Sequence, residues 1–336
     1  MKNLIKNTFK FIVPLVFGGG IVWYLYRGIK IEDIKEVINS GVKWEWILLS
    51  LFIVTLSHII RAYRWKFQLK TLKVNPSVNT LVNSIFGGYS VNLLFPRLGE
   101  IWRCNYISKN QNIPFSTILG SLISERILDM VCMLLITVIA VISQFDFFLS
   151  FFSSHETIVT KLHSFITSPW PYIVLGAIIT ALFFLRKKLT QGAFAQKLQN
   201  ILFGFKQGIK TILQMDRKWT YIFLTALIWV LYFFNFYVCL FAFDFTSEIG
   251  FANAITLFVM GSLAIIVPIQ GGLGPWHFMI ISTLMLFGVG NTQASTFAFV
   301  VHTFQQAVLI ILGIYTIIAI NLGEKLLRSN LMKSKA

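Results

Sequence analysis

Long apolar runs dominate the chain and alternate with short polar stretches. A helix needs about 20 apolar residues to cross the hydrocarbon core of a membrane, and six runs approach or exceed that length. They predict transmembrane helices at 9–26, 44–61, 116–142, 169–185, 219–243 and 294–320. The pattern therefore predicts an all-α polytopic membrane protein with about six full transmembrane helices.

Two further apolar stretches are broken by proline and glycine. The first, 79–95, runs into Pro96 and Gly99, and the second, 251–290, is interrupted by the Pro- and Gly-rich segment 268–275. Such breaks are tolerated within a membrane only where the freed backbone groups face protein or a wet cavity. Both stretches are therefore predicted to form re-entrant or broken helical hairpins.

The composition supports the membrane assignment. Hydrophobic residues make up 56% of the 336 residues, charged residues only 12%, and the mean hydropathy is +0.73. A soluble protein carries about 25% charged residues, so soluble globular and disordered classes are excluded. The three cysteines have no disulfide or zinc spacing, and we expect no metal and no cofactor.

The positive charge is distributed unevenly along the predicted topology. The formal net charge is +16, which in a soluble protein would indicate nucleic acid. Here 23 of the 29 basic residues fall in segments on one side, among them 96–115 and 186–218, and only five fall in the opposite loops. The positive-inside rule then predicts a cell inner-membrane protein with both termini cytoplasmic and no nucleic-acid partner.

The two halves of the predicted topology follow the same order. Residues 9–142 and residues 169–320 each run helix, helix, hairpin, helix, but they begin on opposite sides of the membrane. This is the pattern of an inverted-topology repeat, common in transporters, although any hydrophobic chain can be cut into two similar halves. We expect a single membrane domain, 1–336, with an outer loop at 143–168 and a cytoplasmic tail at 321–336.

Residues 186–218, within the second half, are too polar to span a membrane. Apolar residues recur there at helical spacing, with lysines between them. The pattern predicts a basic amphipathic helix on the anionic inner leaflet. A helix that packs on the bundle fits it almost as well.

Charged residues inside a predicted span are the first candidate site. Glu125, Arg126 and Asp129 lie in the apolar stretch 116–142 and share one helix face, at about 0°, 100° and 40°. Each charge at the bilayer centre costs about 2.5–3.5 kcal/mol on insertion scales, so such groups face a wet cavity or a partner. A structural cluster that neutralises Arg126 is the alternative, but two carboxylates exceed what one arginine needs.

The first hairpin adds Arg97, Glu100 and Arg103. The two arginines offer planar donor groups suited to phosphate, and Glu100 is suited to a cationic head group or to holding an arginine. Interfacial anchors in an ordinary cytoplasmic loop are the alternative reading.

The second hairpin carries a glycine-rich turn followed by a helix start. Its candidate residues are Gln270, Gly271, Gly272, Gly274 and His277. Backbone N–H groups at such a turn can bind an anion, although a glycine kink without a ligand explains the spacing better.

Two helices carry further polar residues. His302, Gln305 and Gln306 share one face of the last span, where they either bridge helices or line a path. Three basic or ionisable residues lie near the end of the second helix, namely His58, Arg61 and Arg64. We expect these three to extend to the inner interface in a mainly structural role.

Three linked motifs carry a family resemblance. Pro96-Arg-Leu-Gly-Glu100 with Arg103, then Ser124-Glu-Arg-Ile-Leu-Asp129, then Gln270-Gly-Gly-Leu-Gly274 resemble the transmembrane region of lysylphosphatidylglycerol synthases, a flippase-like membrane family. The resemblance covers roughly residues 9–320. In the full-length proteins it implies that this region moves aminoacylated phosphatidylglycerol to the outer leaflet. Here it implies a free-standing member without the aminoacyl-transferase domain.

The resulting expectation is a lipid translocase rather than an enzyme. No HExxH, Walker loop, GxSxG or nucleotide fingerprint occurs in the sequence, so no ATP site is expected. The partner would be a membrane phospholipid, anionic or aminoacylated, whose phosphate meets Arg97, Arg103 and Arg126. The alternatives are a membrane-embedded transferase acting on a lipid-linked substrate and a non-transporting partner of a separate lipid-modifying enzyme.

Overall fold

The fold is taken from a computed structural model of the chain. It describes residues 18–147, 215–264 and 269–333, together with isolated positions such as 16, 176 and 267. Within these residues the chain is helical and has no strands. Nearly all of the predicted span 169–185 and of the predicted amphipathic helix 186–218 lies outside the described residues, as does most of the loop 143–168.

Four of the described helices are long and apolar enough to cross a membrane. They are α3 (Trp44–Thr71), α6 (Phe115–Ser143), α11 (Lys218–Leu240) and the Asn291–Leu322 part of α15 (Asn291–Lys333). The chain is therefore a multi-pass membrane protein. Residues 18–26 are also helical and belong to the first predicted span, 9–26.

The remaining described elements are shorter. They are α2 (Ile31–Asn39), α4 (Val78–Leu94), α5 (Leu98–Gln111), α12 (Asp244–Ser247), α13 (Phe251–Ala264), the 3-10 turn η1 (Gln270–Gly272) and α14 (Pro275–Leu286).

The first predicted break is the turn of a helical hairpin. Helices α4 and α5 pack against each other and are joined by residues 95–97, where Arg97 adopts the left-handed conformation with φ 63°. Residues 98–111 form the second arm of this hairpin, so the alternative of an ordinary cytoplasmic loop around Arg97, Glu100 and Arg103 does not describe the segment. This arm is too polar to resemble a membrane helix, and one of its charged side chains, Arg103, is buried against the neighbouring helices.

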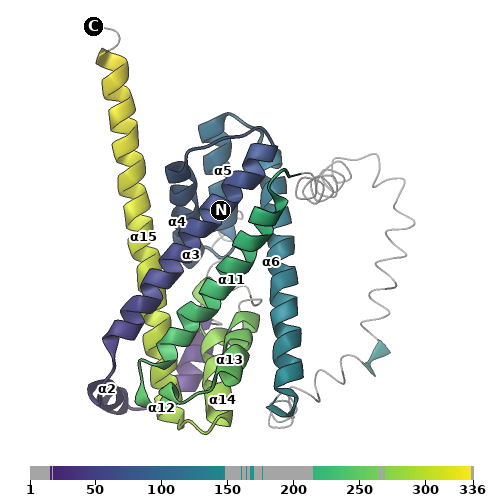
Figure 1. The fold of residues 1–336 in the computed structure, drawn as a ribbon. Coiled ribbons are helices and arrows are strands. Elements are labelled where there is room, and N and C mark those ends of the chain that lie inside the picture. The colour runs from purple at the N-terminus through teal and green to yellow at the C-terminus, as the bar shows by residue number, and fades with distance from the viewer. Residues whose placement is uncertain are drawn as a thin grey trace.

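The second predicted break also joins two packed helices. Helices α13 and α14 contact each other, and the chain between them passes through η1. In Figure 1, α4 and α5 occupy the upper half of the bundle, whereas α13 and α14 occupy the lower half. The turn η1 packs against α4, so the two hairpins meet inside the molecule.

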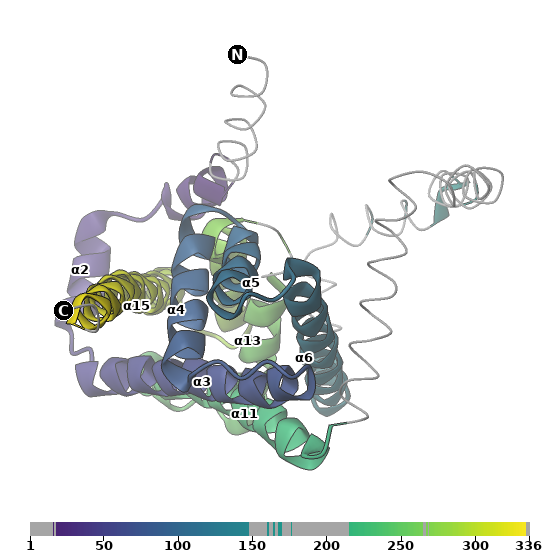
Figure 2. The same cartoon turned by 90° about the horizontal axis from the view of Figure 1, so that it is seen from above.

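The long helices surround these hairpins. Helices α3 and α11 run side by side, and α15 packs against both α4 and α14. Viewed from above, α4 and α5 lie between α15 and α6, and α3 and α11 close a third side (Figure 2). One buried apolar core joins α11, α13, α14 and α15, and another joins α3, α4, α5 and α6.

Apolar side chains are exposed along the outer faces of two long helices. On α6 these include Leu134, Leu135 and Ile139, and on α15 they include Ile311 and Ile318. Contiguous exposed apolar surface of this kind is normal only where lipid replaces water. The inverted repeat stays a prediction, because one of the spans that it requires lies outside the described residues.

Candidate functional site: a buried charged cluster beside a polar cavity

Two acidic side chains on α6 form the centre of a buried charged cluster. Glu125 and Asp129 lie one helical turn apart and are 1% and 7% exposed. On the neighbouring helix α3, Arg61 and Arg64 are 2% and 0% exposed. The four side chains meet across the interface between α3 and α6.

The pairing between these helices is crosswise. Arg61 donates from Nη1 to Glu125 Oε1 at 2.9 Å and from Nη2 to Asp129 Oδ2 at 3.1 Å. Arg64 donates from Nη1 to Asp129 Oδ1 at 3.2 Å, and its Nη2 lies 3.1 Å from Glu125 Oε1. Charge-assisted pairs of this kind fix both the register and the orientation of the two helices.

The expectation that His58, Arg61 and Arg64 extend to the membrane interface is wrong. All three side chains are buried, and the His58 ring stacks on Tyr89 at 4.2 Å between ring centroids. The apolar run 44–61 ends at Arg61, but α3 continues helically to residue 71. The arginines therefore stay inside the bundle, where the carboxylates of α6 replace water as their partners.

The hairpin helix α5 adds a third buried arginine. Arg103 donates from Nη2 to Glu125 Oε2 at 2.5 Å, and its guanidinium lies 4.3 Å from the centre of the Trp65 ring. Glu100, one turn earlier on α5, pairs through Oε1 with Nε of Arg126 at 3.2 Å. The structure thus joins Glu100 and Arg103, two of the three predicted residues of the first hairpin, to the charged residues of α6.

The cluster carries more positive than negative charge. Its members are Arg61, Arg64, Arg103, Arg126, Glu100, Glu125 and Asp129. Four arginines face three carboxylates, so one positive charge is left over among these residues. Because an uncompensated charge away from water is costly, the balance favours an anion beside the cluster.

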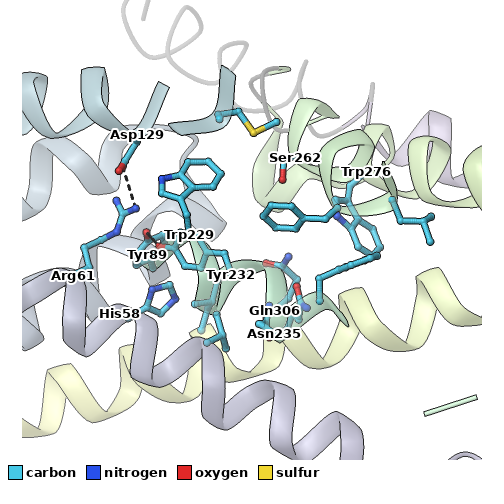
Figure 3. Close-up of a pocket in the computed structure, with 18 of the residues that line it drawn as sticks. His58, Arg61, Tyr89, Asp129, Trp229, Tyr232, Asn235, Ser262, Trp276 and Gln306 are labelled. Atoms are coloured by element: carbon cyan, nitrogen blue, oxygen red, sulfur yellow. Dashed lines mark hydrogen bonds and ion pairs between the residues drawn. The ribbon is translucent and has the colours of Figure 1, made fainter. Parts of the chain in front are cut away.

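A cavity of about 480 Å³ opens beside the cluster. Its charged wall consists of Arg61, Arg126 and Asp129, and Tyr89 and Tyr232 stand next to them (Figure 3). A volume of this size suits a small polar group. We call this space the polar cavity.

The other end of the polar cavity is neutral. In Figure 3, Ser262, Trp276, Asn235 and Gln306 lie away from the Arg61–Asp129 pair. These side chains come from α13, α14, α11 and α15, and Gln305 of α15 joins them in the wall.

Two of the predicted residues on α15 hold the turn of the second hairpin. The carbonyl oxygen of Gly271 lies 2.9 Å from His302 Nε2 and accepts from Gln306 Nε2 at 3.2 Å. His302 also lies against His277, with 4.5 Å between ring centroids. His302 therefore connects α15 to the turn of the second hairpin. Gln306 makes the same connection and also lines the polar cavity.

Three backbone N–H groups of the glycine turn are engaged by the turn itself or by the start of α14. Gly272 donates to the Ile269 carbonyl at 3.1 Å, and Leu273 donates to the Gln270 carbonyl at 3.0 Å. Gly274 donates to His277 Nδ1 at 3.5 Å. This arrangement favours a glycine kink over an anion-binding turn in the conformation described.

Two further results limit the site. Arg97 lies at the exposed turn between α4 and α5 and does not line the polar cavity. In the described part of the chain, no group of three His, Cys, Asp or Glu side chains could hold a metal ion.

An apolar pocket of about 390 Å³ adjoins the polar cavity. It lies between α6, α11 and α13 and is lined by apolar side chains such as Leu135, Ala226 and Phe251. Trp229 and Phe258 line both spaces. A charged compartment and an apolar compartment therefore share a wall.

Sequence reasoning missed part of this site. Asn235 and Trp229 fall within the predicted span 219–243. The available signal was Asn235 itself, because a single amide side chain in an apolar helix indicates a functional or packing role. For Arg61 and Arg64 the signal was their spacing of three, which places both on one helix face.

Comparison with known proteins agrees with the membrane architecture. A UPF0104 membrane protein of Methanocaldococcus jannaschii is 27% identical over 142 residues, 41% of each chain. A UPF0104 membrane protein of Pyrococcus horikoshii is 29% identical over 115 residues, 33% of each chain. The chain thus matches less than half the length of these curated relatives, and no solved structure matches it.

A family model supplies the broader match. The model described as the lysylphosphatidylglycerol synthase TM region matches residues 11–313, which include all seven members of the charged cluster. Because the match spans most of the sequence, this multi-pass membrane protein belongs to the family of the lysylphosphatidylglycerol synthase transmembrane region.

Proposed function

We propose that the protein is a lipid translocase that moves a phospholipid between leaflets without ATP. The observation that carries the proposal is the shared wall between the polar cavity and the apolar pocket. A phospholipid has the same two parts, a charged head group and apolar chains. The head group would occupy the polar cavity while an acyl chain lies in the apolar pocket.

The charged cluster supports a role in phosphate binding. Arg126 lines the polar cavity, and its side chain is 37% exposed, against 4% or less for the other three arginines. A lipid phosphate could therefore reach Arg126 while the buried arginines keep their carboxylate partners. Arginine suits this task because its planar donors match phosphate geometry.

The direction of insertion is part of the proposal. We place the chain in a cell inner membrane with both termini cytoplasmic, on the basis of its basic loops. The two hairpins, one in each half of the bundle, would bring the polar path close to both membrane faces. Movement would be scramblase-like or coupled to an ion.

Translocation in proteoliposomes tests the proposal directly. Acyl-labelled phosphatidylglycerol and lysylphosphatidylglycerol would be reconstituted with the wild-type protein, with Arg126→Gln, or with no protein. We expect fast exchange of at least one lipid with wild-type protein and a loss of at least tenfold in Arg126→Gln. Arg27→Gln makes the same chemical change at an exposed arginine beside Trp23 and Tyr24, and it should leave exchange unchanged.

Other outcomes would favour other functions. Exchange no faster than in empty vesicles contradicts a translocase for these lipids. A chemically altered lipid in the same vesicles would indicate a membrane-embedded transferase. Co-purification of a lipid-modifying enzyme without lipid movement would indicate a non-transporting partner.

A further inference from the structure

The wall of the polar cavity is unsuited to a cationic head group. Its one carboxylate, Asp129, is engaged by Arg61, Arg64 and Arg126 through both oxygens. No other carboxylate lines the cavity among the described residues. The guanidinium of Arg61 also lies 5.7 Å from the centre of the Tyr232 ring. Arg61 therefore occupies the aromatic face that could otherwise bind a cationic head group.

The wall of the polar cavity contains buried polar atoms without protein partners, on Asn235 and Gln306 at its neutral end and on Trp229 beside the Arg61–Asp129 pair (Figure 3). Asn235 Oδ1 and Gln306 Oε1 are unpaired acceptors, and Trp229 Nε1 is an unpaired donor. All three residues line the polar cavity, and Asn235 is 7% exposed. Buried polar groups of this kind require a hydrogen-bonding partner, because leaving each one unpaired is costly.

The chemistry of these atoms specifies the partner. A hydroxyl group can donate to an amide oxygen and accept from an indole N–H, so it satisfies both kinds of atom. An ammonium group only donates and would leave the Trp229 N–H unpaired. The side-chain amides of Asn235 and Gln306 lie away from the Arg61 end of the cavity, as Figure 3 shows.

We infer that the polar cavity selects an anionic phosphodiester lipid whose head group ends in uncharged hydroxyl groups. The phosphate lies at the end formed by Arg61 and Arg126, and the hydroxyl groups bond to Asn235, Gln306 and Trp229. This inference rests on the proposed function only in placing a lipid head group in the cavity. Binding can therefore test it without transport.

Four short-chain lipids, titrated calorimetrically into the purified protein in detergent, provide the test. Dihexanoyl phosphatidylglycerol has the negative charge and the hydroxyls, whereas the phosphatidylmethanol analogue keeps the charge and lacks the hydroxyls. The phosphatidylethanolamine and lysylphosphatidylglycerol analogues add an ammonium group. We expect phosphatidylglycerol to bind at least tenfold more tightly than each of the other three, as two or three hydrogen bonds allow.

A variant then locates the selectivity. Asn235→Leu removes the amide at nearly constant volume and should reduce the preference for phosphatidylglycerol over phosphatidylmethanol to about twofold. Asn105→Leu makes the same change on the exposed face of α5 and should keep the full preference. Trp229→Phe, which keeps a ring but removes the N–H, serves as a second test if Asn235→Leu does not fold.

Each result decides a separate question. Equal binding of phosphatidylglycerol and phosphatidylmethanol, tighter binding of either ammonium lipid, or no binding of any lipid overturns the inference. Selective binding of phosphatidylglycerol without exchange in vesicles keeps the inference and rejects the translocase. Lipid exchange in vesicles without selective binding of phosphatidylglycerol keeps the translocase and rejects the inference.

Discussion

At the scale of single residues, Glu125 organises the charged cluster. All four arginines of the cluster have a guanidinium nitrogen within 3.4 Å of its carboxylate oxygens. The sequence had indicated two carboxylates beside a single arginine, Arg126, whereas the structure has four arginines and three carboxylates. Glu125 is thus better understood as the counter-ion that keeps buried arginines in place than as a free proton carrier.

Replacing Glu125 therefore affects stability first. In Glu125→Gln the charge is lost while Arg61, Arg64 and Arg103 stay buried, so the variant should be less stable by about 3–5 kcal/mol. Denaturation of the purified protein in mixed micelles, followed by circular dichroism, measures this change.

Glu100→Gln is the matched comparison. Glu100 is about one-third exposed at its side chain and pairs with Arg126 alone in the cluster, so its loss should cost clearly less. Equal stability of Glu125→Gln and the wild type would show that the buried arginines find other partners.

At the scale of elements, the first hairpin depends on close backbone approach. The Gly99 N–H donates to Asn92 Oδ1 at 2.8 Å, and a Cβ atom on Gly99 would overlap the Gly88 carbonyl of α4. Helices that approach so closely require glycine at the contact. This contact sets the position of Glu100 and Arg103 relative to α6.

Gly99→Ala should consequently separate α4 from α5. We expect a loss of about 1–3 kcal/mol of stability, typical of overpacking, and weaker lipid binding because Arg103 shifts from Glu125. Thermal denaturation in detergent measures the loss. Gly250→Ala places the same methyl group in open space and should leave the midpoint unchanged; an equal shift in both variants would contradict the packing argument.

At the scale of the whole molecule, the polar cavity and the apolar pocket are assembled from distant segments. Helices α6, α11 and α13 enclose the apolar pocket, and Trp229 separates it from the polar cavity. If an acyl chain lies in this pocket during transport, filling it should slow translocation without removing head-group binding.

Ala226→Trp tests that arrangement. The indole would fill part of the 390 Å³ pocket, and we expect at least a fivefold slower exchange of acyl-labelled lipid in proteoliposomes. Calorimetric binding of a short-chain lipid should change much less. Ile318→Trp, on the exposed face of α15, is the control and should exchange lipid at the wild-type rate; normal exchange in Ala226→Trp would exclude the pocket from the path.

The sequence alone determined the class of protein and much of its outline. Apolar runs near residues 44–61, 116–142, 219–243 and 294–320 predict helices that the structure contains, because hydrocarbon leaves a spanning chain few alternatives. Proline and glycine marked both hairpin turns for the same reason. The charges on α6 were visible because they are costly in an apolar helix.

Only the tertiary structure decided how the charges are paired and what surrounds them. Arg61 and Arg64 lie more than 60 positions from Glu125 and Asp129, so their pairing depends on helix packing that no local pattern records. The polar helix α5 was not predicted for a similar reason, because only its packing against other helices shows that Arg103 is buried. The polar cavity, with its unpaired atoms on α11 and α15, likewise exists only once these helices are packed together.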